Sequence, residues 1–408
     1  MSDELASKYK LVSFRELVPE IPSTTFATFG LYPYPAKFIP QVVAYALKTY
    51  VKSRSKVFDP FAGYGTAGVV ARVYGHDYEL WDLNPLLEVL HSVAIQPPKC
   101  VDVDGLLRQM RGFEGEFVPR WSNIDYWYPQ EFLPLLYKAW GFYHSLEDDV
   151  KLVLAVPLMK VTKHFSYDDL QCHKFCRSPR SLKRVESLLA RDWRAEFFRL
   201  LRAEVEKVLR GVREYWRLSP KEVRCVVKGG VDSLSMDLEE DKDVLITSPP
   251  YLQSHEYIRK TKMDLFWLGF SEYEVKRLSG LEIPYRDARP QPIYSETYSE
   301  LEGQIKEPRL LRTFRNYFWS VIGALTRFQA KITSYMFLFA GRPSLRGRPI
   351  PIDQILAEHF SSLGWTHVET LVDKIVARRL PSLKANPATG IIDSRTQTEN
   401  LVVLKRKR

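Results

Sequence analysis

The chain has 408 residues, 45% hydrophobic and 13% aromatic, and carries a formal net charge of +10. This composition is typical of a folded globular protein and excludes a disordered one, while the charge favours a polyanionic partner. No window of about 18 residues is apolar and uncharged, and the N-terminus lacks the apolar core of a signal peptide. We therefore expect a cytoplasmic protein without a membrane span.

The first 96 residues predict an arm followed by half of an α/β sheet. Residues 1–30 are predicted to be an irregular lead-in, residues 31–40 an aromatic, proline-rich arm, and residues 41–50 a helix. Residues 56–68 predict a strand, a glycine turn and the start of a helix. Gly63 and Gly65 have no Cβ, so the backbone can pass close to a ligand there, and the helix from Thr66 directs N–H groups at the same place.

A second strand is predicted over residues 77–82, and it ends in Asp82. Asp82 follows Gly63 by 19 residues (82 − 63), close to the spacing expected when a carboxylate at a strand end binds the hydroxyls of a ribose. The alternative is an acid that simply faces solvent. Because the glycine turn precedes it, ribose binding is favoured, with Asn84 beside Asp82 in the same site.

Residues 97–222 interrupt the sheet pattern and predict a mainly helical insert, because apolar residues recur at helical spacing over 181–217. Basic and aromatic residues alternate over 161–184, which favours contacts with phosphates and bases over a solvated face. The predicted contacts are Lys163, Phe165, Tyr167, Lys174, Arg177, Arg180, Lys183 and Arg184. Cys172 and Cys176 have three residues between them and no second cysteine pair follows, so ordinary thiols are favoured over a metal site.

The sheet pattern resumes at residues 223–227, and residues 244–247 predict a short buried strand that two prolines end. Later strands are predicted over 333–339, 366–375 and 399–405, with helices over 311–329 and 353–363. Residues 270–305 are predicted to be loop-like and to form a lid. Further phosphate contacts are predicted at Arg259, Arg342, Arg346 and Arg348.

Ser248, Pro249, Pro250 and Tyr251 follow the strand over 244–247 directly. Because ligands of open α/β sheets bind beyond the carboxyl ends of the strands, this rigid segment is predicted to face the ligand. The Ser248 hydroxyl and the Ser248 or Pro249 carbonyl can accept both hydrogens of an exocyclic amine, while Tyr251 stacks on the base. These four residues are the predicted catalytic residues.

The segment resembles the (Asp/Asn/Ser)-Pro-Pro-(Tyr/Phe) signature of S-adenosylmethionine-dependent methyltransferases that modify amines of nucleic-acid bases, with the serine form typical of the cytosine-N4 branch. Residues 59–66 resemble the first motif of that family, Asp-Pro-Phe-x-Gly-x-Gly-Thr. The resemblance implies that S-adenosylmethionine contacts Asp59, Phe61, Gly63, Gly65, Thr66 and Asp82. It also implies that the cofactor's methionine end lies against Tyr34, Lys37 and Phe38, and its adenine amine against Asp232 beside Ser233.

We therefore predict a Rossmann-like class I methyltransferase with a seven-stranded, mostly parallel α/β sheet and a helical insert. The predicted parts are residues 1–96, an arm and the cofactor half; 97–222, the target-recognition insert; and 223–408, the catalytic half. The predicted reaction is methylation of cytosine N4 in structured RNA such as ribosomal RNA, or in DNA, by a monomer without a metal. The alternatives are a site-specific DNA methyltransferase acting on adenine N6 or cytosine N4, and an inactive fold that only binds nucleic acid.

Overall fold

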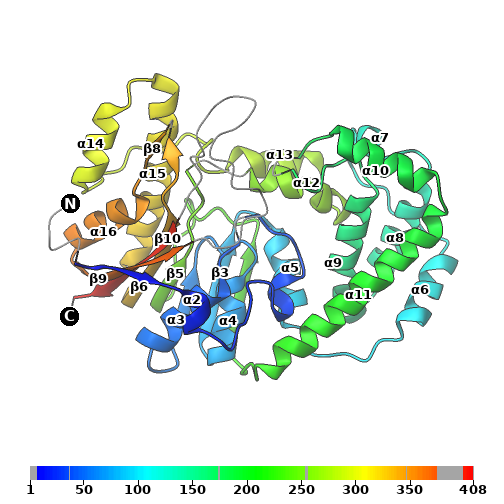
Figure 1. The fold of residues 1–408 in the computed structure, drawn as a ribbon, viewed down its shortest axis with the longest axis horizontal. Coiled ribbons are helices and arrows are strands. Elements are labelled where there is room, and N and C mark those ends of the chain that lie inside the picture. The colour runs from blue at the N-terminus through cyan, green and yellow to red at the C-terminus, as the bar shows by residue number, and fades with distance from the viewer. Residues whose placement is uncertain are drawn as a thin grey trace.

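The computed structural model describes residues 7–35, 37–172, 175–252, 256–345, 347–374 and 398–407. Its centre is an eight-stranded sheet flanked by helices (Figure 1). The spatial order of the strands is β4 (Cys225–Gly229), β3 (Asp77–Asp82), β2 (Lys56–Asp59), β5 (Lys242–Thr247), β6 (Ile332–Gly341), β10 (Thr398–Arg406), β9 (Trp365–Lys374) and β1 (Tyr9–Val12). All neighbouring pairs are parallel except the two that β10 makes with β6 and β9.

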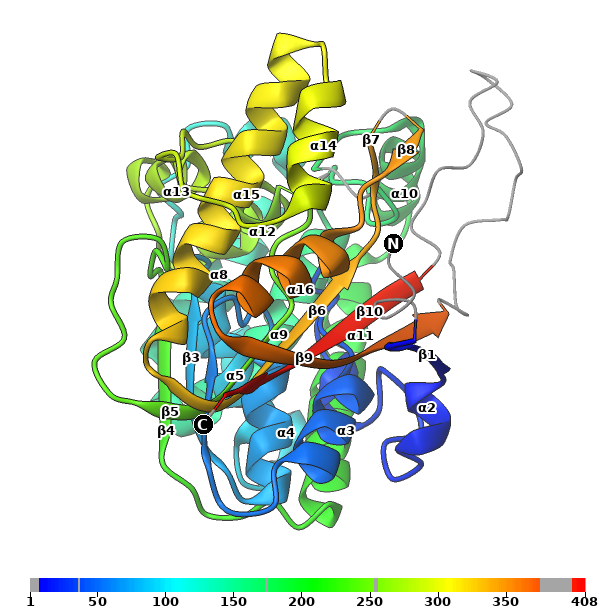
Figure 2. The same ribbon diagram turned by 90° about the vertical axis from the view of Figure 1, so that its left-hand side faces the viewer.

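The prediction of seven strands is wrong by one, because the N-terminal lead-in contributes β1. Tyr9 to Val12 pair in parallel with Thr370 to Asp373 of β9, at the edge of the sheet (Figure 2). The rest of the lead-in is also ordered into α2 (Phe14–Leu17) and a 3₁₀ helix, η1 (Ala27–Gly30). Two short strands, β7 (Ser344–Leu345) and β8 (Arg348–Pro349), form a separate hairpin.

Alternation along the strands sends side chains to two different cores. Val57, Val244 and Ile246 pack on one face of the sheet with α3 (Pro40–Tyr50) and α4 (Thr66–Tyr74). Phe58 and Leu245 pack on the other face with α15 (Pro308–Gln329) and α16 (Ile352–Ser362). The sheet is therefore covered on both faces, as a mostly parallel sheet requires.

The helical region lies to one side of the sheet (Figure 1). It follows α5 (Leu86–Ile95) and consists of α6 (Val103–Gly112), α7 (Ile124–Trp127), α8 (Leu133–Ser145), α9 (Asp148–His164), α10 (Pro179–Leu189) and α11 (Trp193–Arg217). Its core includes α12 (Tyr257–Trp267), a helix of the predicted catalytic half: the Trp267 ring stacks on Trp140 at 5.7 Å, and its indole N–H donates to the Tyr128 hydroxyl at 2.9 Å. The predicted boundaries at 96 and 222 stay predictions.

The segment predicted to be a loop over 270–305 contains two helices, α13 (Glu272–Gly280) and α14 (Glu296–Gln304). The start of α13 is fixed by a capping box in which Ser271 and Glu274 bond to each other's backbone N–H. Between the two helices, residues 281–295 have no regular structure. Across the described residues, no helix is both long and apolar enough to cross a membrane.

Candidate active site

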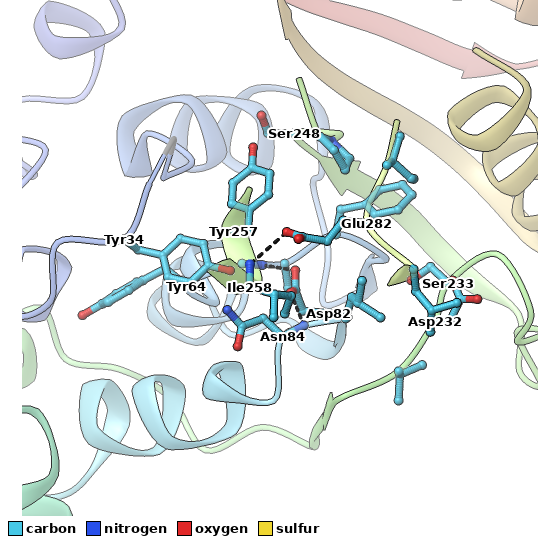
Figure 3. Close-up of a pocket in the computed structure, with 18 of the residues that line it drawn as sticks. Tyr34, Tyr64, Asp82, Asn84, Asp232, Ser233, Ser248, Tyr257, Ile258 and Glu282 are labelled. Atoms are coloured by element: carbon cyan, nitrogen blue, oxygen red, sulfur yellow. Dashed lines mark hydrogen bonds between the residues drawn. The ribbon is translucent and has the colours of Figure 1, made fainter. Parts of the chain in front are cut away.

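The carboxyl ends of β2, β3, β4 and β5 meet at one edge of the sheet, and a cavity of about 780 Å³, its open mouth included, lies there. After β2 the chain forms β3 and β4 on one side of it and then returns to form β5 on the other side. The ends of β2 and β5 therefore mark a topological switch point, where open α/β sheets bind ligands. The walls of the cavity include Tyr34, Asp82, Asp232, Ser248, Tyr257 and Glu282 (Figure 3).

The glycine turn after β2 forms one wall of the cavity. Gly63 has a φ of +55°, and a Cβ placed on it would lie 3.1 Å from Cε1 of Tyr34, so a side chain there would crowd the cavity. Gly65 is the N-cap of α4 with a φ of +85°, a left-handed conformation that favours glycine. Gly63 therefore leaves room at the cavity wall, whereas a Cβ on Gly65 would meet His91 and Leu87, so Gly65 serves the turn itself.

Asp82 reaches the cavity from the end of β3 in a fixed orientation. One carboxylate oxygen accepts the Gly63 N–H at 2.7 Å, and the other accepts the Asn84 N–H at 2.8 Å. Burial raises the pKa of Asp82 to about 6, while these two hydrogen bonds oppose the rise. The predicted acid thus faces the cavity and is oriented by the glycine turn itself.

Two of the predicted cofactor residues, Asp59 and Thr66, are buried next to the loops that line the cavity and do not line it themselves. Asp59 is buried, and one of its oxygens accepts the Thr247 hydroxyl at 2.6 Å and the Phe61 N–H at 3.1 Å, so it joins the turns after β2 and β5. Thr66 is fully buried at the start of α4. Phe61 lines the cavity, whereas Asp59, Gly65 and Thr66 do not.

The turn after β4 carries Asp232 and Ser233, which both line the cavity. The Ser233 hydroxyl donates to the Pro60 carbonyl at 2.5 Å, which ties this turn to the one after β2. Both oxygens of Asp232 accept from Nη1 of Arg286 at 2.8 Å. Arg286 was not predicted; it comes from the irregular segment between α13 and α14.

The N-terminal arm closes the far end of the cavity with Tyr34, Lys37 and Phe38. The Tyr34 ring stacks on Tyr257, with centroids 6.4 Å apart. Lys37 donates to the Phe29 carbonyl and lies over the Tyr64 ring at 5.0 Å, and burial lowers its pKa to about 8. All three predicted arm residues therefore reach the cavity.

Of the predicted catalytic residues, Ser248 and Pro250 line the cavity, whereas Pro249 and Tyr251 do not. The Tyr251 hydroxyl donates to the carboxylate of Glu399, at the start of β10. Burial, together with this carboxylate, raises the pKa of Tyr251 far above its usual value. The ring of Tyr251 is therefore held by β10, and its predicted stacking on a base stays a prediction.

Sequence reasoning missed the wall formed by Tyr257, Ile258 and Glu282. One oxygen of Glu282 accepts the Ile258 N–H at 2.8 Å, which joins the segment after α13 to the start of α12 (Figure 3). Burial raises the pKa of Glu282 to about 7, and the charge of nearby Asp82 adds to the rise. The signal was a single acid between two apolar residues, Leu281 and Ile283, in an otherwise polar segment.

The predicted nucleic-acid contacts in the helical region do not share one surface. Phe165 is fully buried against Phe132 and Phe197, so its predicted contact with a base is wrong. Lys163 is nearly buried and binds Asp264 at 2.9 Å, and Arg184 donates to three backbone carbonyls. These two cations hold the protein together and are not available to phosphate.

The other predicted contacts differ in exposure. Arg180 and Lys183 are exposed on α10, and Arg177 lies over the rings of Tyr126 and Tyr167, at 4.6 and 4.1 Å. Elsewhere, Arg342 pairs with Asp353 through two bonds of 2.9 and 2.7 Å, which makes it a packing residue. Arg259 pairs with Glu256 and Arg348 donates to Gln304, both at the surface, while Lys174 and Arg346 lie outside the described residues.

Comparisons with known proteins identify two methyltransferases of similar sequence and one structure with a weak overall match. The chain is 24% identical over 425 aligned positions to the Type II methyltransferase M.MvaI of Kocuria varians, covering 94% of this chain and 91% of that protein. It is 32% identical over 119 positions to the Type II methyltransferase M.MjaII of Methanocaldococcus jannaschii, covering 27% and 22%. An rRNA methyltransferase, AviRa of Streptomyces viridochromogenes, superimposes with a TM-score of 0.32 and 11% identity, covering 95% of this chain and 92% of that one.

No model of a known protein family matches the chain. The full-length similarity to one Type II methyltransferase supports the class that the sheet and its pocket suggest, an S-adenosylmethionine-dependent methyltransferase. The TM-score of 0.32 is too low to carry any part of that argument. Among the described residues, no group of three or more histidine, cysteine, aspartate or glutamate side chains is arranged to hold a metal ion.

Proposed function

We propose that this chain transfers a methyl group from S-adenosylmethionine to the N4 amine of cytosine in nucleic acid. The observation that carries the proposal is that Ser248 and Pro250, of the Ser-Pro-Pro-Tyr segment, share one cavity with Gly63 and Asp82 of the predicted cofactor motifs. These residues come from loops 185 positions apart (248 − 63) and meet because β2 and β5 are neighbours.

The cavity fits S-adenosylmethionine in shape and in chemistry. Asp82 presents a half-buried, oriented carboxylate that suits ribose hydroxyls, and the glycine turn leaves space that a Cβ at position 63 would fill. The aromatic rings of Tyr34 and Tyr257 suit a positively charged sulfur, because a cation is attracted to the face of a ring. Apolar walls at Val231, Ile258 and Ile283 suit the adenine ring.

Ser248 would hold the target amine. The cofactor, when bound, supplies an electrophilic methyl group on a cationic sulfur. The Ser248 hydroxyl, with a backbone carbonyl beside it, would accept the amine hydrogens and direct the nitrogen lone pair toward the cavity. The amine nitrogen bonds to the methyl carbon as the carbon–sulfur bond breaks, which leaves neutral S-adenosylhomocysteine, and the methylated amine then releases one proton to water. This role therefore requires positioning rather than a strong base.

The serine of the motif favours cytosine N4 over adenine N6, since the resemblance associates Asp or Asn at that position with adenine. The chain's similarity to two Type II methyltransferases, a term used for enzymes that modify DNA, favours DNA over the structured RNA that the basic, aromatic insert and the overall charge would suit. An inactive binding module is disfavoured because Asp82, Gly63 and Ser248 all reach the cavity.

Methylation of defined substrates tests the proposal directly. The purified full-length chain would be incubated with methyl-labelled S-adenosylmethionine and either duplex DNA or ribosomal RNA, followed by nuclease digestion and mass spectrometry of the nucleosides. We expect label in N4-methyldeoxycytidine from DNA. Label only in N4-methylcytidine would move the substrate to RNA, label in an N6-methylated adenine nucleoside would overturn the base assignment, and no binding of S-adenosylmethionine by calorimetry would overturn the activity.

A further inference from the structure

The irregular segment after α13 sends two oppositely charged side chains to the cavity wall from one tight turn. The backbone N–H groups of Tyr285 and Arg286 both bond to the Glu282 carbonyl, at 3.0 and 3.1 Å. This turn places the Glu282 side chain in the cavity and directs Arg286 to Asp232. Arg286 is thereby neutralised by Asp232, so Glu282 contributes a negative charge that the turn itself does not balance.

Glu282 and Asp82 are therefore two carboxylates that face one cavity and have no cationic partner among the described residues. Neither forms an ion pair with any basic side chain in the part of the chain that the structure describes. Glu282 is only 6% exposed. The remaining lysine of the cavity wall, Lys37, is directed at the Phe29 carbonyl and the Tyr64 ring. Unpaired buried carboxylates are unfavourable unless a ligand supplies positive charge.

We propose that Glu282 is a specificity-determining residue that makes the cavity prefer cationic S-adenosylmethionine to neutral S-adenosylhomocysteine. The inference rests on the proposed function, because it takes S-adenosylmethionine as the ligand. The two compounds share adenine, ribose and amino-acid groups and differ in the methyl group and the positive charge on sulfur. A negative wall in a poorly solvated cavity favours the charged compound, and this preference promotes release of the product once the methyl group has left.

A purely structural role for Glu282 is the competing explanation, since its carboxylate accepts the Ile258 N–H at the start of α12. Glu282→Gln separates the two roles. Glutamine keeps the shape and an acceptor oxygen for Ile258 but removes the charge. Loss of a structural contact would weaken both ligands alike, whereas loss of the charge would weaken S-adenosylmethionine alone.

The test is calorimetric titration of the full-length chain with each compound at pH 8, where Glu282 is ionised. We expect E282Q to weaken S-adenosylmethionine binding about tenfold, equivalent to about 1.4 kcal/mol, and to change S-adenosylhomocysteine binding less than about twofold. The matched control is Glu358→Gln: Glu358 also accepts bonds from Ser295 and Thr297 but does not line the cavity, so neither affinity should change.

Equal weakening of both compounds, or no change in their ratio, would overturn the inference while leaving the proposed function intact. If the wild-type chain bound neither compound, the proposed function would fail and the inference with it. The pH dependence of binding to the wild-type chain tests the same inference without a variant that could misfold. The affinity ratio should rise from pH 6 to pH 8 as Glu282 loses its proton, and a constant ratio would also overturn the inference.

The pH measurement must allow for the groups that face Glu282. These are Asp82 at the end of β3, Glu256 and Tyr257 at the start of α12, and Tyr34 and Lys37 of the arm. Burial lowers the pKa of Lys37 to about 8, so its loss of positive charge toward pH 8 acts in the same direction as the ionisation of Glu282. The pKa values of both tyrosines are raised above the range of the experiment. Asp82, whose pKa is raised to about 6, loses its proton in the same direction as Glu282. E282Q should therefore reduce the rise in the ratio without abolishing it.

Discussion

Three carboxylates in or beneath the cavity, the buried Asp59 and Glu282 and the half-buried Asp82, have raised pKa values because burial penalises their charged forms. Asp353, another buried acid, instead pairs with Arg342. The difference is functional in the proposed reaction. Asp353 pairs with a cation and holds the fold together, whereas Asp82 and Glu282 line the cavity and have no basic partner among the described residues.

Asp59 should make stability depend on pH. Its pKa is raised to about 7, so the folded chain binds this proton more tightly than the unfolded chain, where the value is about 4. The stabilisation is complete below about pH 4 and is lost as the pH rises through about 7. Asp59→Asn should therefore reduce the fall in unfolding free energy between about pH 5 and pH 7.5, measured by urea denaturation. An identical fall in both proteins would contradict the prediction.

Ser248→Ala should separate catalysis from folding. Within the described part of the chain, the Ser248 hydroxyl forms no hydrogen bond and faces the cavity, so its removal should change stability by less than about 0.5 kcal/mol. Turnover should fall by orders of magnitude, because the target amine loses an acceptor that orients it. Steady-state methylation and calorimetry with S-adenosylmethionine measure the two effects, and Ser233→Ala is the contrasting variant.

Ser233→Ala should instead destabilise the protein, since its hydroxyl bonds to the Pro60 carbonyl across two loops. Turnover of Ser248→Ala close to that of the wild type would remove the Ser-Pro-Pro-Tyr segment from the active site.

At the scale of elements, strands such as β2, β3 and β5 were predictable as short runs of apolar, mostly buried residues, and helices where apolar residues recur at helical spacing. β5 was expected from Val244 to Thr247 and begins two residues earlier. β1 could not be predicted, because Tyr9–Val12 is only four residues long and contains no fully buried residue. It forms a strand only through its pairing with β9, which is far away in the sequence. α13 was missed although its capping box, Ser271 with Glu274, is a readable signal.

The candidate site divides in the same way. Residues tied to a strand end or a glycine turn, such as Asp82 and Gly63, were predictable because topology brings strand ends together. Glu282 and Arg286 were not, because their place depends on how an irregular turn packs against α12 and Asp232. Likewise, burial of Phe165 follows from the packing of helices that no local pattern specifies.

The bond between Tyr251 and Glu399 connects the catalytic segment to β10. Glu399 is half-buried and burial raises its pKa, so loss of the tyrosine hydroxyl removes a hydrogen bond from a poorly solvated carboxylate. Tyr251→Phe should lower the free energy of unfolding by about 1–3 kcal/mol, measured by denaturant titration. Tyr50→Phe is the matched control: Tyr50 donates to Glu369, which keeps Lys10 as a partner, so its effect should be smaller. Equal effects of the two substitutions would show that the bond from Tyr251 to Glu399 stabilises the protein no more than the bond from Tyr50 to Glu369.

For the whole molecule, whose net charge is +10, the basic residues predicted over 161–184 do not form one exposed surface. Cations in the helical region such as Lys163 and Arg184 are used in internal bonds. The exposed cations, Arg180 and Lys183, project from α10, on the same side of the molecule as α12 and α13 (Figure 1). A nucleic-acid surface that reaches the cavity must therefore rely on a few exposed cations rather than on the whole basic stretch.

Arg180→Gln with Lys183→Gln should weaken nucleic-acid binding more at low salt than at high salt. Each lost phosphate contact reduces the slope of log affinity against log salt by about one unit, because fewer counterions are released on binding. Arg180 is 62% exposed and only 3.5 Å from Asp169, a weak pair that phosphate can replace. Fluorescence anisotropy with a labelled duplex over a salt series measures the slope.

The control for that variant is Lys52→Gln with Lys56→Gln. These lysines lie at and just before the amino end of β2, at the sheet edge opposite the cavity. Their substitution removes the same amount of charge as the α10 variant. If binding depends on net charge alone, the two double variants will change the slope equally. A larger change in the α10 variant would assign phosphate contact to the helical region. An unchanged slope in the α10 variant would mean that the basic face of α10 is an ordinary solvated surface. The phosphate contacts would then be sought at Arg259 and Arg348, the other predicted cations exposed near the cavity side of the sheet.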